Sequence, residues 1–215
     1  MNSTTKKITT IGMLCAMAIL LNILFHFPIV PAVSFLNYDP KDIVIVIGGF
    51  IYGPSASFVM SGICAVLDIM FRGGNIIDVL MNMIATCSFC CLASYIYKKN
   101  HTKNGAIVGL FAGIMAVTIS MVVWNCIVTP FYYHLPKETV FGLLLPGIIP
   151  FNLIKYGLNA GVALFLYKPV VKALRSSHLV EEGKNKEGLT RDVALVGAFI
   201  IVSLILLILS LQGII

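Results

Sequence analysis

The chain has 215 residues, of which 59% are hydrophobic and 11% are charged, and its formal net charge is +6. Because soluble domains carry about 25% charged residues, this composition excludes an ordinary soluble domain and predicts an integral membrane protein. No segment shows the alternating hydrophobicity of a porin strand, so we predict an all-α protein with helical spans.

The N-terminal segment "MNSTTKKITTIGML" is basic and then apolar, as in a signal peptide. No small-residue cleavage site precedes a soluble domain, and further apolar spans follow directly. We therefore expect this segment to begin a first transmembrane helix and not a removable signal.

Seven apolar segments follow one another along the chain. The predicted helices are 8–27, 43–52, 55–71, 76–97, 105–133, 141–167 and 193–211. A membrane span needs about 20 residues, so 43–52 is too short to cross alone, and we expect the Gly-Pro turn in "GGFIYGPSAS" to join it to the next helix in a tight hairpin. Pro146 and Pro150 indicate that the sixth helix proper begins near Pro150, since proline suits a first helical turn.

The lysine and arginine residues predict the orientation, because they gather in cytoplasmic loops. With the N-terminus inside, eleven of the 15 lie in inner segments, three lie in outer loops (Lys41, Arg72 and Lys137), and Lys155 lies in the membrane. We therefore expect a multi-pass protein with a cytoplasmic N-terminus. The positive charge reflects this topology and does not indicate nucleic-acid binding.

The composition divides the chain into three parts. Residues 1–175 hold the first six helices, residues 176–192 form a polar cytoplasmic linker, and residues 193–215 hold an additional transmembrane helix that would leave the C-terminus outside. The last helix carries no charge, so we interpret it as a peripheral addition.

Three polar residues interrupt the apolar segment "IPFNLIKYGLN". Asn152, Lys155 and Asn159 are three and four residues apart, which places them on one stripe of a helix. A buried lysine is costly in a membrane. One interpretation is that Lys155 snorkels to the outer surface; the other, which the two amides favour, is a contact with a polar ligand.

A second polar point lies in "VVWNCIVTPFYY". Trp124 and the tyrosines of this stretch are typical of an aromatic belt at the outer interface. Asn125 lies about two turns deeper than those tyrosines, so it is interpreted either as a ligand contact or as a hydrogen bond between helices.

The first outer loop contributes further candidates. Asn37, Tyr38 and Asp39 precede a proline and are predicted to form a turn over a pocket, and Asp42 is interpreted as the N-cap of the short helix. At the outer ends of the third and fourth helices, Asp68 is expected to pair with Arg72, and Asp78 is assigned a structural role; all of these are read from the sequence.

These polar residues share one level at the outer side. Amides donate and accept hydrogen bonds, lysine donates to a ring carbonyl, and aromatic faces stack on a flat ring, so the set suits a flat, neutral heterocycle. No acid pair, nucleophile with a base or phosphate loop is visible, which gives no support to an enzyme. The CxxC spacing of "CSFCC" also occurs in metal and redox sites, but free cysteines inside apolar runs usually act as packing residues. The histidines lie near span ends and in loops, and we expect no metal site.

Three stretches carry a resemblance to a known family: "FLNYDPKDIVIVIGGFIYGP", "WNCIVTPFYY" and "PFNLIKYGLNAGVALFLYKP". The chain resembles the S component, or substrate-specificity subunit, of an energy-coupling factor (ECF) vitamin transporter, and specifically the riboflavin-binding type. The resemblance covers about residues 8–175 and implies a six-helix S-component bundle in the plasma membrane of a prokaryote.

The resemblance implies that riboflavin is bound from outside with high affinity, beneath the first outer loop, as a transported substrate and not as a cofactor. Its isoalloxazine ring would contact Asn125, Asn152 and Lys155. The S component would dock onto an ECF module, which has a transmembrane T component and two ABC ATPases, and deliver the vitamin by toppling in the bilayer. The small residues implied in docking are Gly12, Ala16 and Ala18, although the family's AxxxA-like pattern is not kept.

Three alternatives remain open. The chain could be an S component for another heterocycle, such as thiamine or a queuosine precursor, a membrane enzyme acting on lipid, or a non-transport assembly subunit. Because the resemblance ends near Arg175, we expect deletion of the chain from about residue 182 to leave ligand binding nearly intact.

Overall fold

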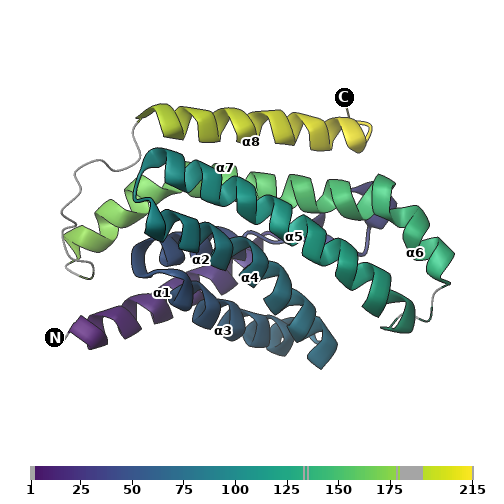
Figure 1. Ribbon diagram of the computed structural model, residues 1–215, viewed down its shortest axis with the longest axis horizontal. Coiled ribbons are helices and arrows are strands. Elements are labelled where there is room, and N and C mark those ends of the chain that lie inside the picture. The colour runs from purple at the N-terminus through teal and green to yellow at the C-terminus, as the bar shows by residue number, and fades with distance from the viewer. Residues whose placement is uncertain (1–2, 133, 135, 178, 180–190, 215) are drawn as a thin grey trace.

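The computed structural model describes residues 3–132, 134, 136–177, 179 and 191–214, and helices dominate it (Figure 1). Most of the predicted linker, residues 178 and 180–190, lies outside the described residues. The elements in chain order are α1 (Ser3–Leu24), β1 (Phe27–Pro28), η1 (Pro31–Val33), β2 (Asn37–Tyr38), α2 (Lys41–Tyr52), α3 (Pro54–Arg72), α4 (Ile76–Lys99), α5 (Lys103–Tyr132), α6 (Lys137–Leu143), η2 (Leu144–Ile148), α7 (Ile149–Ser176) and α8 (Arg191–Leu211).

The short helix α2 lies at the centre of the bundle. Every residue from Lys41 to Phe50 is buried, and α1, α3, α4 and α7 all contact the helix. Its side chains Ile45, Val46 and Ile47 belong to the main hydrophobic core. A helix that is apolar on all sides is stable only when neighbours cover it, which explains how a segment too short to span the membrane is held there.

Turn residues set the ends of α3 and α4. Gly53 has a φ of 90°, and Pro54 then occupies the first turn of α3, so the predicted Gly-Pro hairpin between α2 and α3 is confirmed. The Asn75 side chain caps α4, and the Asp78 carboxylate accepts a hydrogen bond from the Asn75 backbone N–H in a capping box, which satisfies N–H groups that would otherwise be unpaired.

The predicted cap of α2 is wrong. Pro40 occupies the N-cap position and no side chain caps the helix. Asp42 is fully buried, and its carboxylate accepts a hydrogen bond of 2.8 Å from the Thr86 hydroxyl on α4. The carboxylate is therefore held by a neighbouring helix and not by the N-terminus of its own.

The sixth helical path is longer than predicted. The α-helix α7 does begin at Ile149, next to Pro150, but α6 and the π-helical segment η2 precede it without a break. Pro146 lies inside η2, where the wider π turn accommodates a residue that cannot donate a backbone hydrogen bond. The two prolines therefore mark a change of helix type and not the start of the span.

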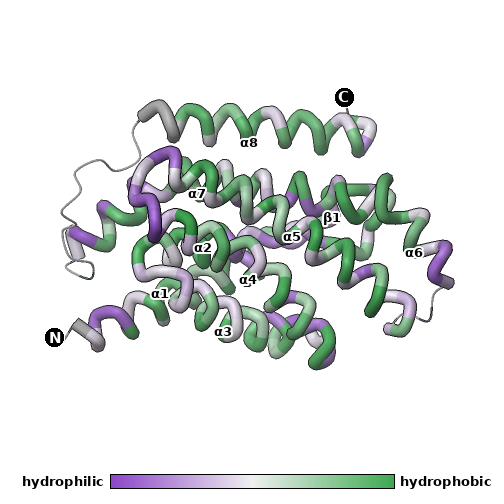
Figure 2. The backbone as a smooth tube through the Cα atoms, viewed as in Figure 1, coloured by the Kyte–Doolittle hydropathy of each residue, from purple (hydrophilic) through white to green (hydrophobic). Residues whose placement is uncertain are grey.

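Five helices are long and apolar enough to cross a membrane among the described residues: Thr4–Leu24, Pro54–Arg72, Ile76–Lys99, Lys103–Tyr132 and Lys137–Ser176, with Leu195–Leu211 as a shorter apolar helix. Figure 2 shows that hydrophilic residues gather toward the ends of the bundle, while the helices between them are hydrophobic. The molecule is an all-α membrane bundle.

The two ends of the bundle differ. At one end, the ammonium of Lys7 on α1 lies over the Tyr52 ring at the end of α2, and the Lys98 side chain lies beside Gly53. At the other end, α3 finishes at Arg72 and α4 begins at Ile76, after the glycine-rich turn. Lys99 at the end of α4 and Lys103 at the start of α5 belong to the first end as well.

Candidate ligand-binding site

The site begins with the segment between α1 and α2, residues 25–40, here called the α1–α2 loop. Its two short strands pair antiparallel, with Phe27 opposite Tyr38 and Pro28 opposite Asn37. Ile29, Val30 and Val33 are buried against Ile148 and neighbouring residues in a second hydrophobic cluster. Burial of these apolar side chains fixes the loop in place, so its polar residues are presented in a defined arrangement.

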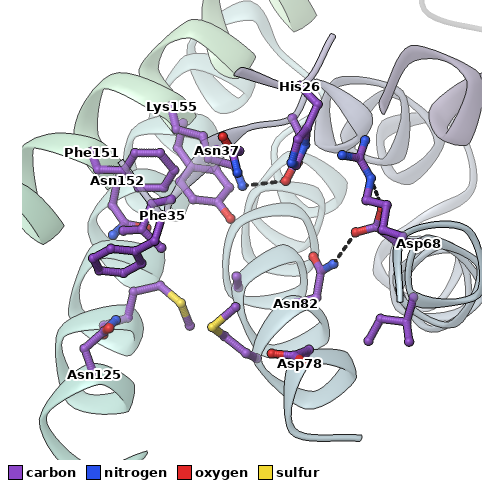
Figure 3. A pocket seen from close by; sticks show the side chains of 18 of the residues that line it. His26, Phe35, Asn37, Asp68, Asp78, Asn82, Asn125, Phe151, Asn152 and Lys155 are labelled. Carbon is purple, nitrogen blue, oxygen red and sulfur yellow. Dashed lines mark hydrogen bonds and ion pairs between the residues drawn. The ribbon is translucent and has the colours of Figure 1, made fainter. Parts of the chain in front are cut away.

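A cavity of about 210 Å³ lies between this loop and the ends of α3, α4, α5 and α7 (Figure 3). One buried water needs only about 10–15 Å³, so the cavity is far larger than the site of a single water. Its lining consists of His26, Phe35, Leu36, Asn37, Asp39, Asp68, Ile69, Arg72, Gly73, Asp78, Met81, Asn82, Ala85, Met121, Asn125, Phe151, Asn152, Lys155 and Tyr156.

Lys155 is buried and ion-paired. Its ammonium lies 2.9 Å from Asp39 Oδ2, and the ammonium of Lys41 lies 3.0 Å from Asp39 Oδ1. Burial raises the pKa of Asp39, but the ammonium groups of Lys155 and Lys41 outweigh that effect and hold the pKa below its ordinary value. With only 8% of Lys155 exposed, the structure excludes the interpretation that it snorkels to the outer surface.

The two predicted amides face the same cavity. The Asn152 amide donates to the Ile148 carbonyl at 2.8 Å, and the Asn125 amide donates to the Met121 carbonyl at 2.7 Å. The Asn125 oxygen accepts a bond of 2.9 Å from the Thr129 hydroxyl, one turn along the same helix. Both hydrogen bonds of Asn125 stay within α5, so among the described residues it does not join two helices. The Asn152 bond reaches back to the last residue of η2, and both amides are held at the cavity wall.

Acidic and amide side chains form the opposite wall. Asp68 accepts hydrogen bonds from Asn22 (2.7 Å) and Asn82 (2.9 Å) and pairs with the Arg72 Nε at 2.9 Å, as Figure 3 shows for Asn82 and Asp68. The expected Asp68–Arg72 pair is therefore confirmed. Asp78 accepts a hydrogen bond of 3.1 Å from the Tyr132 hydroxyl.

Aromatic rings surround the lysine. The Lys155 ammonium lies 5.8 Å from the centroid of Phe151 and 5.3 Å from that of Tyr156, within the range of cation–π attraction. Phe35 of the α1–α2 loop also lines the cavity. A flat ring that enters the cavity would find both stacking faces and hydrogen-bonding groups.

Two of the predicted site residues, Trp124 and Tyr38, lie away from the cavity, as does Asn159 of the polar stripe. Trp124 lines a separate, apolar depression on the α4 and α5 surface with Ile84, Ile119 and others. Tyr38 is buried behind the lining, where its ring packs 5.6 Å from that of Phe27. Asn159 is fully buried, one turn beyond Lys155, and its amide lies 3.4 Å from the Asp39 carbonyl.

The three proposed docking residues do not share one face of α1. Gly12 and Ala16 lie exposed on α1, whereas Ala18 is fully buried in the main core. Since Ala18 follows Ala16 by two residues, it projects toward the opposite side of the helix. Ala18 is therefore removed from the predicted docking face.

Sequence reasoning missed several lining residues. Asn82 interrupts the apolar run of α4 four residues after Asp78, the spacing that puts two side chains on one helix face. That polar pair was a detectable signal for the second wall. Phe35, Met121 and Phe151 gave no such signal, because apolar residues are expected throughout a membrane helix.

Comparisons with known proteins agree with this geometry. The model of a protein family described as "ECF transporter, substrate-specific component" matches residues 6–167. The riboflavin transporter FmnP of Bacillus subtilis is 32% identical over 189 residues, which cover 81% of this chain and 98% of that protein. The riboflavin transporter RibU of Staphylococcus aureus is 29% identical over 177 residues, with 79% and 93% covered.

The fold also matches a solved structure. A structure described as that of the S component of a bacterial ECF transporter superimposes with a TM-score of 0.69 at 29% sequence identity. The match covers 80% of this chain and 99% of the other. About one fifth of the chain therefore has no counterpart in that structure.

Proposed function

Since the chain belongs to the family of ECF transporter substrate-specific components, we propose that it binds riboflavin in the cavity beneath the α1–α2 loop and delivers it inward. The chain is the substrate-binding component of an ECF transporter and not an enzyme. The choice of riboflavin is supported by relatives named as riboflavin transporters. The observation that carries it is the meeting of Asn125, Asn152 and Lys155 in one cavity.

The side of the cavity that holds Lys155, Asn125 and Asn152 suits the isoalloxazine ring. The imide edge of the ring both donates and accepts hydrogen bonds, which an asparagine amide complements. Lys155 has three N–H donors and uses one toward Asp39, so others are left for a ring carbonyl. Phe35, Phe151 and Tyr156 supply faces on which the ring would stack.

The acidic wall suits the sugar-alcohol chain. Hydroxyl groups donate to carboxylates and accept from amides, and Asp68, Asp78 and Asn82 lie together across the cavity from Lys155 (Figure 3). A ligand with a flat ring at one end and a polyol at the other would match both walls.

Delivery would require partners. In this proposal the S component docks, through a face that includes Gly12 and Ala16 of α1, onto a transmembrane T component with two ABC ATPases. It then topples so that the bound vitamin reaches the cytoplasmic side. Small residues permit close helix approach in lipid, and both lie exposed on α1. The N-terminus would be cytoplasmic and the cavity would open to the outside, because the basic residues favour the opposite end of the bundle.

The test is a titration of the purified protein with riboflavin, without ATP. Flavin fluorescence should be quenched and should saturate at one equivalent. Thiamine and other heterocyclic vitamins should not compete. Saturable binding of another vitamin, with no flavin quenching at micromolar concentration, would replace riboflavin by that ligand.

A further inference from the structure

The helix α8 lies beyond the residues that the family model matches, which end at residue 167. In Figure 1 it runs alongside α7 for most of its length, and extensive contacts join the two helices. It was expected to be a peripheral addition with no part in ligand binding. Its contacts argue against that expectation.

Small residues fix the position of α8 along α7. A Cβ atom at Gly197 of α8 would lie 2.7 Å from the Gly161 carbonyl oxygen, and one at Gly161 would lie 3.2 Å from the Gly197 carbonyl oxygen. One turn earlier on α7, a Cβ at Gly157 would lie 3.0 Å from Leu204. Backbones this close hold two helices in one register in lipid, so α8 has little freedom to slide.

This register brings the end of α8 to the α1–α2 loop. Ile208 is buried in the second hydrophobic cluster, together with Ile29, Val33 and Tyr38 of the loop. The Gln212 amide then donates to the Pro28 carbonyl at 3.3 Å.

Pro28, which accepts the Gln212 bond, and the loop residues that share the cluster with Ile208 are linked to the cavity lining. Pro28 pairs with Asn37 in the two-stranded sheet, and Asn37 lines the cavity. Tyr38 precedes Asp39, which holds Lys155. Phe151 of α7 belongs both to the second cluster and to the cavity lining. A shift of Ile208 would therefore displace both the α1–α2 loop side and the α7 side of the cavity.

We infer that α8 is a positioning element of the binding site: through Ile208 and Gln212 it holds the α1–α2 loop in the conformation that binds ligand. The expected effect on ligand affinity rests on the proposed riboflavin binding. The expected effect on the order of residues 25–40 is independent of it. Deletion of α8 would then weaken ligand binding instead of leaving it intact.

The test compares Ile208→Ala with Ile205→Ala in the full-length chain. Both variants remove the same atoms from the same helix, but Ile205 is 45% exposed whereas Ile208 is 8% exposed. Three quantities are measured for each protein: the hydrogen exchange of peptides covering residues 25–40 without ligand, the riboflavin Kd and the thermal midpoint.

Ile208→Ala should accelerate exchange in residues 25–40 and raise the Kd by about tenfold, equivalent to about 1.4 kcal/mol. Ile205→Ala should match the wild type in both. If Ile208→Ala does not fold, Ile208→Val should give a smaller change in the same direction. A lower thermal midpoint with unchanged loop exchange and unchanged Kd would reduce α8 to a general packing role and overturn the inference.

The two proposals fail in different ways. If the wild-type protein does not bind riboflavin, the proposed function fails, while the exchange comparison still decides whether α8 orders the loop. If the wild type binds riboflavin and the two alanine variants exchange alike, only the role of α8 is lost. Gly197→Leu would push α8 away from α7 and should change loop exchange and Kd as Ile208→Ala does. The matched control for Gly197→Leu is Ser203→Leu, at an exposed position of α8.

Discussion

The ammonium of Lys155 on α7 lies 2.9 Å from the carboxylate of Asp39 in the α1–α2 loop. This pair joins residues 116 positions apart at the wall of the cavity. Lys155 therefore has two partners in the proposed complex: the ligand, and the loop that covers it.

The double role changes what Lys155→Met should do. Removal of a charge-assisted donor to a ring carbonyl should weaken riboflavin binding by about ten- to a hundredfold. The same change leaves the buried Asp39 with Lys41 alone. Loss of one partner from a buried pair is destabilising, so the thermal midpoint should fall, whereas removal of an unpaired buried lysine would have raised it.

Lys41→Met is the matched control for that measurement. Lys41 is buried, pairs with the same carboxylate at 3.0 Å and does not line the cavity. It should lower the thermal midpoint but raise the riboflavin Kd by less than Lys155→Met does. Equal losses of affinity in the two variants would mean that Lys155 acts only through Asp39 and does not contact the ligand.

The asparagines of α7 give a second comparison. Asn152→Ala should raise the riboflavin Kd by about tenfold or more, because a hydrogen bond to a ring edge is lost. Asn159→Ala, one turn past Lys155, should do less, since Asn159 lies outside the cavity lining and makes only a long contact of 3.4 Å to the loop. Calorimetric titration of both variants tests this order, and the reverse order would move the ring site deeper into the bundle. Asn125→Ala on α5 should behave like Asn152→Ala.

Much of this arrangement was readable from the sequence because membrane helices constrain it strongly. Apolar length predicted α1, α3, α4 and α5, and the spacing of Asn152 and Lys155 correctly predicted that one helix face turns to a polar site. The Asp39–Lys155 pair was not predictable, because no local pattern links a loop residue to a helix so far along the chain. The second wall, Asp68 and Asn82, was underestimated because Asp68 was assigned to its local partner Arg72 alone.

The error at Trp124 has a simple geometric cause. Successive residues on a helix point about 100° apart, so the side chain next to Asn125 cannot share its direction. Trp124 accordingly lies in the apolar depression and Asn125 in the cavity. Proximity in sequence was mistaken for proximity in space.

Trp124→Phe should therefore leave the riboflavin Kd within about twofold of the wild-type value. The variant removes no side chain that lines the cavity. Phe151→Leu, which removes a ring from the cavity lining, is the contrasting variant and should weaken binding. A large loss of affinity in Trp124→Phe, with an unchanged thermal midpoint, would place a ligand contact outside the cavity described above.

Orientation provides a prediction that does not depend on the ligand. With the basic end inside, a tag at the N-terminus should be protected from protease in intact cells, and a tag after α8 should be accessible, because the two termini lie at opposite ends of the bundle (Figure 1). Permeabilised cells supply the control in which both tags are cleaved. An accessible N-terminal tag in intact cells would invert the proposed topology.

The charge of the cavity predicts discrimination against phosphorylated flavin. The lining holds three carboxylates, Asp39, Asp68 and Asp78, and two cations, Arg72 and Lys155. Burial and the nearby Arg72 guanidinium lower the pKa of His26 below its ordinary value, so this side chain is neutral at pH 7 and the lining carries a net charge of −1. Both cations are already paired with carboxylates.

A flavin phosphate adds a charge of about −1.5 to −2 at pH 7 and would find no unpaired cation in this lining. Flavin mononucleotide should therefore bind at least about tenfold more weakly than riboflavin. Asp78→Asn removes one of the opposing charges while keeping an oxygen that can accept from Tyr132, so it should narrow the gap between the two ligands. Raised salt should narrow the gap as well, because it screens the repulsion.

Parallel titrations of both ligands against wild type and Asp78→Asn measure the ratio of the two Kd values directly. Equal affinities in the wild type, insensitive to salt, would show that the phosphate lies outside the cavity and that its acidic wall does not select the ligand.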